Sequence, residues 1–196
     1  MNEKLDAGEI ILQKEIEIKE NNTAQEIHDK LANIGGKLIN DVLKKIEKGD
    51  YIIVLGGDNY RIGMGGSSVS SVSTGEYGNK IELNAVQRAN PEMQKRVFNV
   101  IRALGEEDIN PILSIHDHGA GGHLNCLSEL LEESGGIINI EKLPVGDHTL
   151  SEKEIIGNES QERIGIIIKE SDYKVVEEIA NRERAPIYIV GKVTDD

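Results

Sequence analysis

The sequence predicts an α/β or α+β fold, with a mixed sheet, flanking helices and an N-terminal strand-helix extension. Short apolar runs of strand length, such as 51–55 and 164–168, alternate with longer segments whose apolar residues recur every three or four positions. Residues that favour helix starts precede several of the longer segments. This alternation is typical of a layered domain in which helices pack on a sheet.

The extension covers residues 1–49. Residues 9–18 end in alternating charged and apolar side chains, which is the period of a half-buried strand. Thr23 and Glu26 then form a capping box, because the hydroxyl and the carboxylate can satisfy free amides at a helix start. Gly49 is a natural end for that helix. Its apolar positions fall on one face, at Ile27, Leu31, Ile34, Leu38, Val42 and Ile46.

A second domain is expected over residues 50–196. Its strands are predicted at 51–55, 111–115, 137–140, 164–168 and 187–193. Its helices are predicted from Asn90 to Gly105, around 124–131, from Ser151, and from Ser171 to about Arg184. Asn90 is expected to cap a helix whose first residue is Pro91, and Ser151 with Glu154 forms a second capping box.

Composition excludes several classes of function. The formal net charge of −13 opposes binding of nucleic acid by the general surface, and a chain with no Trp and one Phe lacks a stacking platform. No apolar run approaches the roughly 20 residues of a membrane span, and the N-terminus is not a signal peptide. One cysteine, Cys126, excludes an internal disulfide and fits a cytoplasmic protein.

The glycine-rich stretch 55–68 follows a predicted strand and has two interpretations. Gly65 and Gly66, just before Ser67, can bring backbone amides close to a phosphate at a helix start. The stretch is not a P-loop, because no Lys precedes Ser67. The alternative is tight packing of two glycine-bearing segments, and the sequence alone does not decide between the two.

The loop 116–123, His-Asp-His-Gly-Ala-Gly-Gly-His, is expected at the end of a buried strand, where open sheets commonly bind ligands. Its glycine amides, at Gly119, Gly121 and Gly122, can cradle a phosphate, and Asp117 can bind Mg²⁺ through oxygen. Zinc is disfavoured, because no cysteine pair or His-Glu-x-x-His accompanies the three histidines. A structural role, with Asp117 capping the next helix, also stays open.

The string 158–163, Asn-Glu-Ser-Gln-Glu-Arg, crowds charged and amide side chains before an apolar run. Glu159 or Glu162 can bind a metal or act as a base, and Arg163 can pair with a phosphate. The alternative, favoured on these residues alone, is an internal ion pair of Arg163 with one of the glutamates or with the cluster 182–184. Cys126 is expected to be a buried small hydrophobe.

Several strings, in order, closely resemble one segment of phosphoribosylformylglycinamidine synthase in its large single-chain form. They lie at 54–57, 63–66, 85–93, 116–122, 157–163 and 182–186. This family of ligases converts formylglycinamide ribonucleotide to its amidine with ATP and glutamine, in purine biosynthesis. The resemblance implies the C-terminal half-domain of the first of two aminoimidazole-ribonucleotide-synthetase-like units, which helps to form a phosphate-bearing ligand site with other domains.

The resemblance also implies site residues and cofactors. Asp117 and Glu159 are candidate metal-linked groups, Mg²⁺ and ATP are the implied cofactors, and no catalytic residue is assigned. By position, the resemblance makes Gly119, Gly121 and Gly122 candidate phosphate or nucleotide contacts. Gly65, Gly66 and Arg163 are added as candidates from the chemistry of the residues.

The 196 residues do not contain the rest of that enzyme's apparatus. A preceding half-domain with a Ser-His-Asn-His-Pro-type signature, a second synthetase-like unit and a glutaminase have no counterpart here. Because turnover needs reactants held by several elements, the isolated chain is expected not to be catalytic. The alternative function is a non-enzymatic domain that binds a phosphorylated small molecule or serves as a scaffold.

Residues 1–49 resemble a different family. The strings 3–14, 22–24 and 28–31 are similar to the end of the catalytic domain of methionyl-tRNA formyltransferase. Asp6 falls at that family's catalytic aspartate, but the partner Asn and His are not present. We therefore expect a chimera joined near Gly49–Asp50, with formyltransferase activity as the least expected function. A structural hypothesis is that residues 1–49 supply only a packing strand and helix, with an apolar face that drives self-association.

Overall fold

The computed structural model describes residues 14–19, 21–42 and 46–195 of the chain. By its internal contacts the chain divides into two compact units, 1–45 and 46–196. None of the helices in the described ranges combines the length and the apolar character that a membrane crossing needs.

The first unit contains the helix α1 (Ala24–Val42), and its predicted start is confirmed. The amide of Thr23 donates to Glu26 Oε2 at 2.9 Å, and the amide of Glu26 donates to the Thr23 hydroxyl at 3.3 Å. Of the predicted strand, residues 14–18 pair with no described segment and form no strand, while residues 9–13 lie outside the described residues. Ile46, predicted on this helix, instead packs against the core of the second unit.

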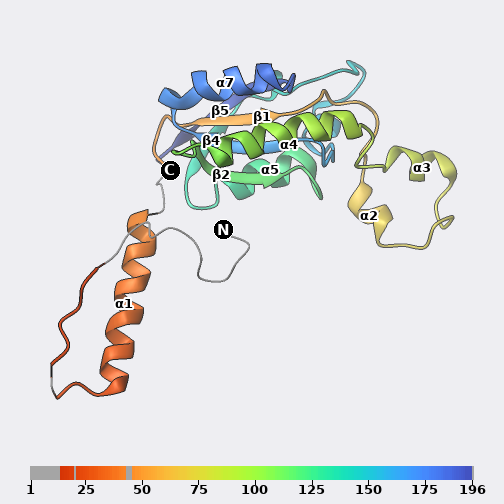
Figure 1. Ribbon diagram of the computed structural model, residues 1–196. Helices are drawn as coiled ribbons and strands as arrows, with labels where there is room; N and C mark the ends of the chain where they lie inside the picture. Colours follow the sequence, from red (N-terminus) through yellow and green to blue (C-terminus); the bar gives the residue numbers. More distant parts are fainter. Residues whose placement is uncertain (1–13, 20, 43–45, 196) are drawn as a thin grey trace. The chain divides into compact units, whose positions relative to one another are not determined.

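The second unit is built on a five-stranded sheet. Every neighbouring pair of strands is antiparallel. The predicted α+β class is confirmed, but the sheet is antiparallel where the sequence predicts a mixed one. The strands, in the spatial order β2-β4-β1-β5-β3 (Figure 1), are β1 (Tyr51–Leu55), β2 (Ile112–Asp117), β3 (Gly135–Ile138), β4 (Ile164–Ile168) and β5 (Ile187–Thr194).

The order of the strands explains this difference. The strands β1, β2 and β3 run in the same direction, as the helical connections between them suggest. However, β4 lies between β1 and β2, and β5 lies between β1 and β3. No two parallel strands are therefore neighbours, and every ladder in the described sheet is antiparallel.

Helices cover both faces of the sheet, which is why its central strands are apolar throughout. The helices α4 (Pro91–Glu106) and α7 (Tyr173–Arg182) pack on one face, against Ile53 and Leu55 of β1. The helices α5 (Gly122–Leu130) and α6 (Glu152–Ile156) pack on the other face, against Ile52 and Val54. Figure 1 shows α7 and α5 on opposite sides of the sheet. Alternate residues of β1 thus enter two separate cores.

Most predicted helix starts are confirmed. Asn90 caps α4 by accepting from the amide of Met93 at 3.0 Å, and the predicted capping box begins α6. Ser171 does not cap α7, because residues 170–172 form a 3-10 turn and the helix begins at Tyr173. The short helices α2 (Gly66–Ser70) and α3 (Asn79–Asn84) follow β1. No residue of α3 is buried, and its apolar side chains, Ile81 and Leu83, are exposed.

Three loops leave the same end of the sheet. Leu55 at the end of β1 pairs with Ile164 at the start of β4, and so does Asp117 at the end of β2. The loops that follow β1 and β2 and the loop that precedes β4 therefore begin side by side, although they are far apart in the sequence.

The buried face of α5 can be tested with two leucines. Leu127→Ala is expected to lower the free energy of unfolding by about 2–5 kcal/mol, because this side chain is 1% exposed and its loss leaves a cavity. Leu124 lies on the same helix and is 59% exposed, so Leu124→Ala is expected to cost less than about 0.5 kcal/mol. Urea denaturation measures both values. Equal losses would contradict the orientation of α5.

Removal of residues 1–45 tests whether the second unit is independent. Both apolar cores are formed by residues from 46 onward. The shortened chain is therefore expected to unfold cooperatively, with a midpoint within about 4 °C of the full chain, a difference of roughly 1 kcal/mol. Scanning calorimetry of the two chains measures this shift. A lost transition would show that the extension is needed for folding.

Candidate functional site

The backbone of residues 159–161 joins the three loops at the end of the sheet. The amides of these residues donate, each at 2.9 Å, to the carbonyls of Gly63, His118 and Gln87, in that order. The segment thereby fixes the glycine-rich loop after β1, the His-Asp-His-Gly loop after β2 and the residues before α4 relative to one another.

Two glycines of the predicted loops are needed for close packing. A Cβ at Gly63 would lie 1.7 Å from the carbonyl oxygen of Glu159, and a Cβ at Gly122 would lie 2.3 Å from that of Asn158. Gly122 also has a φ of 60°, which favours glycine. Close packing, the alternative offered for the stretch 55–68, therefore accounts for Gly63, and the loop after β2 packs closely at Gly122 as well.

The carboxylate of Glu159 lies at the centre of the loops and is surrounded by donors. The residue is 4% exposed. Ser67 donates to it through its amide at 2.8 Å and its hydroxyl at 3.0 Å, and Gly121 donates through its amide at 3.1 Å. The side-chain amide of Gln87 donates a fourth hydrogen bond. Since a carboxylate has about four acceptor sites, Glu159 is saturated and clamps the start of α2 to the start of α5.

The same loops also present exposed backbone at their turns. Gly65 and Ala120 are both exposed, and within residues 46–195 the amide of Ala120 donates to no protein acceptor, whereas Gly65 follows the isolated antiparallel bridge between Met64 and Asn158. Asp117 is exposed as well, and accepts from the amide of Gly119 at 2.7 Å. It therefore orders its own loop and does not cap α5, which begins without a side-chain cap. Exposed amides in such turns are suited to bind an anion.

Arg163 lies inside the protein and is 1% exposed. Its guanidinium donates to the side chain of Asn59, and to the side-chain oxygen and carbonyl of Asn158 at 2.6 and 2.7 Å. The predicted ion pair with a glutamate or with the 182–184 cluster is absent from the described ranges. Burial lowers the pKa of the Arg163 guanidinium to about 10, so the group stays cationic at neutral pH.

A chain of hydrogen bonds runs from Arg163 to two buried histidines. A guanidinium only donates, so Asn59 turns its oxygen to it and donates its amide to the carbonyl of Pro144 at 2.6 Å and to His123 Nε2 at 3.1 Å. His123 Nδ1 then carries the proton and donates to His118 Nε2 at 2.9 Å. Burial first, and then the charge of Arg163, hold the pKa of both rings well below its ordinary value. Both histidines are therefore neutral.

The three histidines of the loop do not converge on one point. His116 pairs with Glu129, away from the buried pair. Among the described residues, no three His, Cys, Asp or Glu side chains are placed to hold a metal ion together. Cys126 is buried, as predicted, and burial raises the pKa of its thiol to about 12.

The structure unites only part of the predicted site. Arg163 is turned inward, away from the loop surface. The sequence does not predict that Ser67 and Gln87 contact Glu159, or that Asn59 contacts Arg163, because no spacing links these residues. The local sign that Ser67, Gln87 and Asn59 could belong to a site was that each lies near glycines or a helix start. The predicted residues that do lie together are Gly65, Gly66, Gly121 and Glu159.

Comparison with known proteins identifies relatives of this fold and site. The chain is 41% identical over 150 residues to the probable phosphoribosylformylglycinamidine synthase, chloroplastic/mitochondrial, of Arabidopsis thaliana, a match that covers 75% of this chain and 10% of that protein. It is 40% identical over 152 residues to the phosphoribosylformylglycinamidine synthase of Homo sapiens, covering 76% and 11%. The chain thus spans about a tenth of the length of these curated relatives.

A solved structure and a family model agree with this result. The T. maritima PurL complexed with FGAR is similar with a TM-score of 0.65 and 26% identity, over 78% of this chain and 25% of that chain. The family model described as AIR synthase related protein, C-terminal domain, matches residues 47–196, which include all five strands and the three loops. Over these residues, the chain belongs to the family of AIR synthase related protein C-terminal domains.

Proposed function

We propose that residues 50–196 form the C-terminal half-domain of the first synthetase-like unit of a phosphoribosylformylglycinamidine synthase. Such an enzyme converts formylglycinamide ribonucleotide to its amidine with ATP and glutamine. The observation that carries this proposal is the 41% identity over 150 residues to the Arabidopsis synthase. The similarity to a T. maritima PurL complexed with FGAR supports it. The other synthase domains are the proposed partners, and ATP is a second proposed ligand.

The exposed amides beside Glu159 are the proposed contact for the ligand's phosphate. Gly65 and Ala120 are exposed at the turns of these loops, and the amide of Ala120 has no protein acceptor within residues 46–195. Glu159 keeps their two loops together through Ser67 and Gly121, so it acts by positioning them.

Arg163 has a supporting role in this proposal. It is 1% exposed and its guanidinium donates to Asn59 and Asn158, so it does not reach a ligand. Instead it holds Asn158, whose backbone lies against Gly122. The close approach of these two backbones keeps the loop after β2 in place.

The donor set fits Mg²⁺ at Asp117 and does not fit it at Glu159. A metal at Glu159 would have to displace the N–H and O–H donors that fill its acceptor sites. Asp117 is exposed and accepts one hydrogen bond from protein, so its carboxylate is open to a hard cation. Bound there, Mg²⁺ would offset the negative charge of a phosphate.

The proposed function rests on the range that the family model matches, and the N-terminal extension lies outside it. The family model begins at residue 47. The resemblance of residues 1–49 to methionyl-tRNA formyltransferase and the join near Gly49–Asp50 remain predictions.

Calorimetric titration with formylglycinamide ribonucleotide tests the proposed phosphate contact. We expect saturable binding that Gly65→Asp weakens about tenfold or more, because the new carboxylate repels the phosphate. Gly65→Asn is the matched control, since Asn has the same shape and tolerates the same left-handed backbone (φ 65°). Its affinity is expected to stay within about threefold of the parent. No binding by the folded chain, or equal losses in both variants, would contradict the proposal.

A turnover assay tests whether the 196-residue chain is catalytic alone. With formylglycinamide ribonucleotide, ATP, Mg²⁺ and ammonia, we expect no steady formation of ADP, because the chemistry needs groups held by several domains. Ammonia is supplied so that the absence of a glutaminase does not decide the result. Steady ADP formation that Gly65→Asp abolishes would show the opposite.

A further inference from the structure

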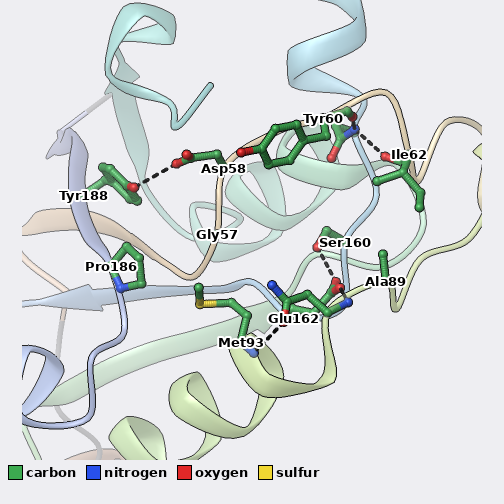
Figure 2. Close-up of a pocket in the computed structure, with 12 residues that line it drawn as sticks. Gly57, Asp58, Tyr60, Ile62, Ala89, Met93, Ser160, Glu162, Pro186 and Tyr188 are labelled. Carbon is green, nitrogen blue, oxygen red and sulfur yellow. Dashed lines mark hydrogen bonds between the residues drawn. The ribbon is translucent and has the colours of Figure 1, made fainter. Parts of the chain in front are cut away.

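A cavity of about 280 Å³ lies beside the candidate phosphate contact (Figure 2). The side chains of Asn158, Ser160 and Glu162 line it, whereas the carboxylate of Glu159, between them in sequence, is bonded to the glycine-rich loops. The loop after β1, the start of α4 and the start of β5 form the remaining walls. The cavity is therefore distinct from the phosphate contact, and its size approaches that of small-molecule sites, about 300 Å³ and above.

The walls of the cavity are acidic. Glu162 is 4% exposed, and its carboxylate accepts from the amide of Asn90 at 2.6 Å and from the hydroxyl of Ser160. Asp58 accepts from the hydroxyl of Tyr188 at 3.1 Å. Burial and then Asp58 raise the pKa of Tyr188 to about 12, so its hydroxyl stays protonated. Both carboxylates thus have neutral donors, and no described lining residue is Lys, Arg or His.

The nearby cations have other partners. Arg163, behind the wall, donates to Asn59 and Asn158, and the charges of Glu162 and Asp58 also stabilise its cation without a hydrogen bond. Arg61 pairs with Glu154, and with Asp147 at 3.8 Å. Two carboxylates at the cavity wall face one buried guanidinium behind it, so the wall keeps a net negative charge. The cavity therefore favours binding of a positively charged ligand and disfavours binding of a phosphate or a carboxylate.

The rest of the wall is apolar and partly aromatic. Figure 2 shows Tyr60 and Tyr188 on either side of Asp58, and Met93 beside Glu162. Aromatic faces favour a flat ligand body and attract a cation. A carboxylate can bind a planar cation through two parallel N–H···O hydrogen bonds. Charge and shape together favour a flat organic cation over a metal ion.

We propose that this cavity binds a small organic cation with a planar amidinium or guanidinium head and an apolar body. Glu162 and Asp58 supply the negative charge, and Tyr60, Met93 and Pro186 contact the apolar body. The charge and the shape of this cavity do not depend on the proposed phosphate contact at Gly65 and Ala120. The cavity and the phosphate contact can therefore be tested separately.

Titration of the full chain with benzamidine, followed by NMR chemical shifts, tests this proposal. Benzamidine carries an amidinium on a flat apolar ring, and benzamide is its neutral counterpart of the same shape. We expect saturable binding of benzamidine, with shifts at Tyr60, Ile62 and Met93, and at least about tenfold weaker binding of benzamide. Equal affinity for the two probes, or no saturation by benzamidine, overturns the proposal.

Charge variants locate the site. Asp58→Asn and Glu162→Gln keep the shape of each side chain, and each is expected to weaken benzamidine binding about fivefold or more. Glu132→Gln is the matched control, because it removes an exposed charge outside the cavity, and its effect is expected to stay below about twofold. Circular dichroism establishes that each variant is folded. If Glu162→Gln does not fold, Asp58→Asn carries the test, and unchanged affinity in that variant overturns the proposal.

Discussion

A buried guanidinium whose hydrogen bonds in the described ranges go to uncharged acceptors organises one end of the sheet. Arg163 has only donors, so each neighbour must turn an acceptor toward it. Asn158 does so with two oxygens and Asn59 with one. The remaining amide of Asn158 is then directed to the carbonyls of Tyr60 and Ile62, which shapes the loop after β1. One side chain thus determines how the amides of two loops are oriented.

Glu159, four residues before Arg163, needs donors where Arg163 needs acceptors. It has only acceptors, and it gathers donors from the loops on its own side of the segment. The burial of these charged groups costs several kcal/mol each when ionic partners are absent. The Nε of Arg163 and the Nδ1 of His118 add to that cost, since neither has a described partner. The two apolar cores of the sheet offset this cost, and the loops gain one defined arrangement in return.

The fold could be predicted from the sequence to the extent that it depends on local pattern. The five apolar residues at 164–168 form a strand at those positions, and the caps at Asn90 and Ser151 are where their side chains suggest. The sheet direction could not be predicted, because it depends on which distant strands become neighbours. The same holds for the site. Arg163 meets Asn59 across 104 residues and Glu159 meets Gln87 across 72, and no local spacing encodes either contact.

The position of β1 in the sheet has a consequence for how the chain is synthesised. This central strand is made early, but its two neighbours, β4 and β5, come from the last third of the sequence. While the ribosome adds residues 56–163, four fully buried apolar residues, Ile52 to Leu55, have no strand to pair with. Closing so long a loop is slow, and an unpaired apolar strand is prone to aggregate. The nascent chain therefore carries an unpaired apolar strand until β4 has emerged.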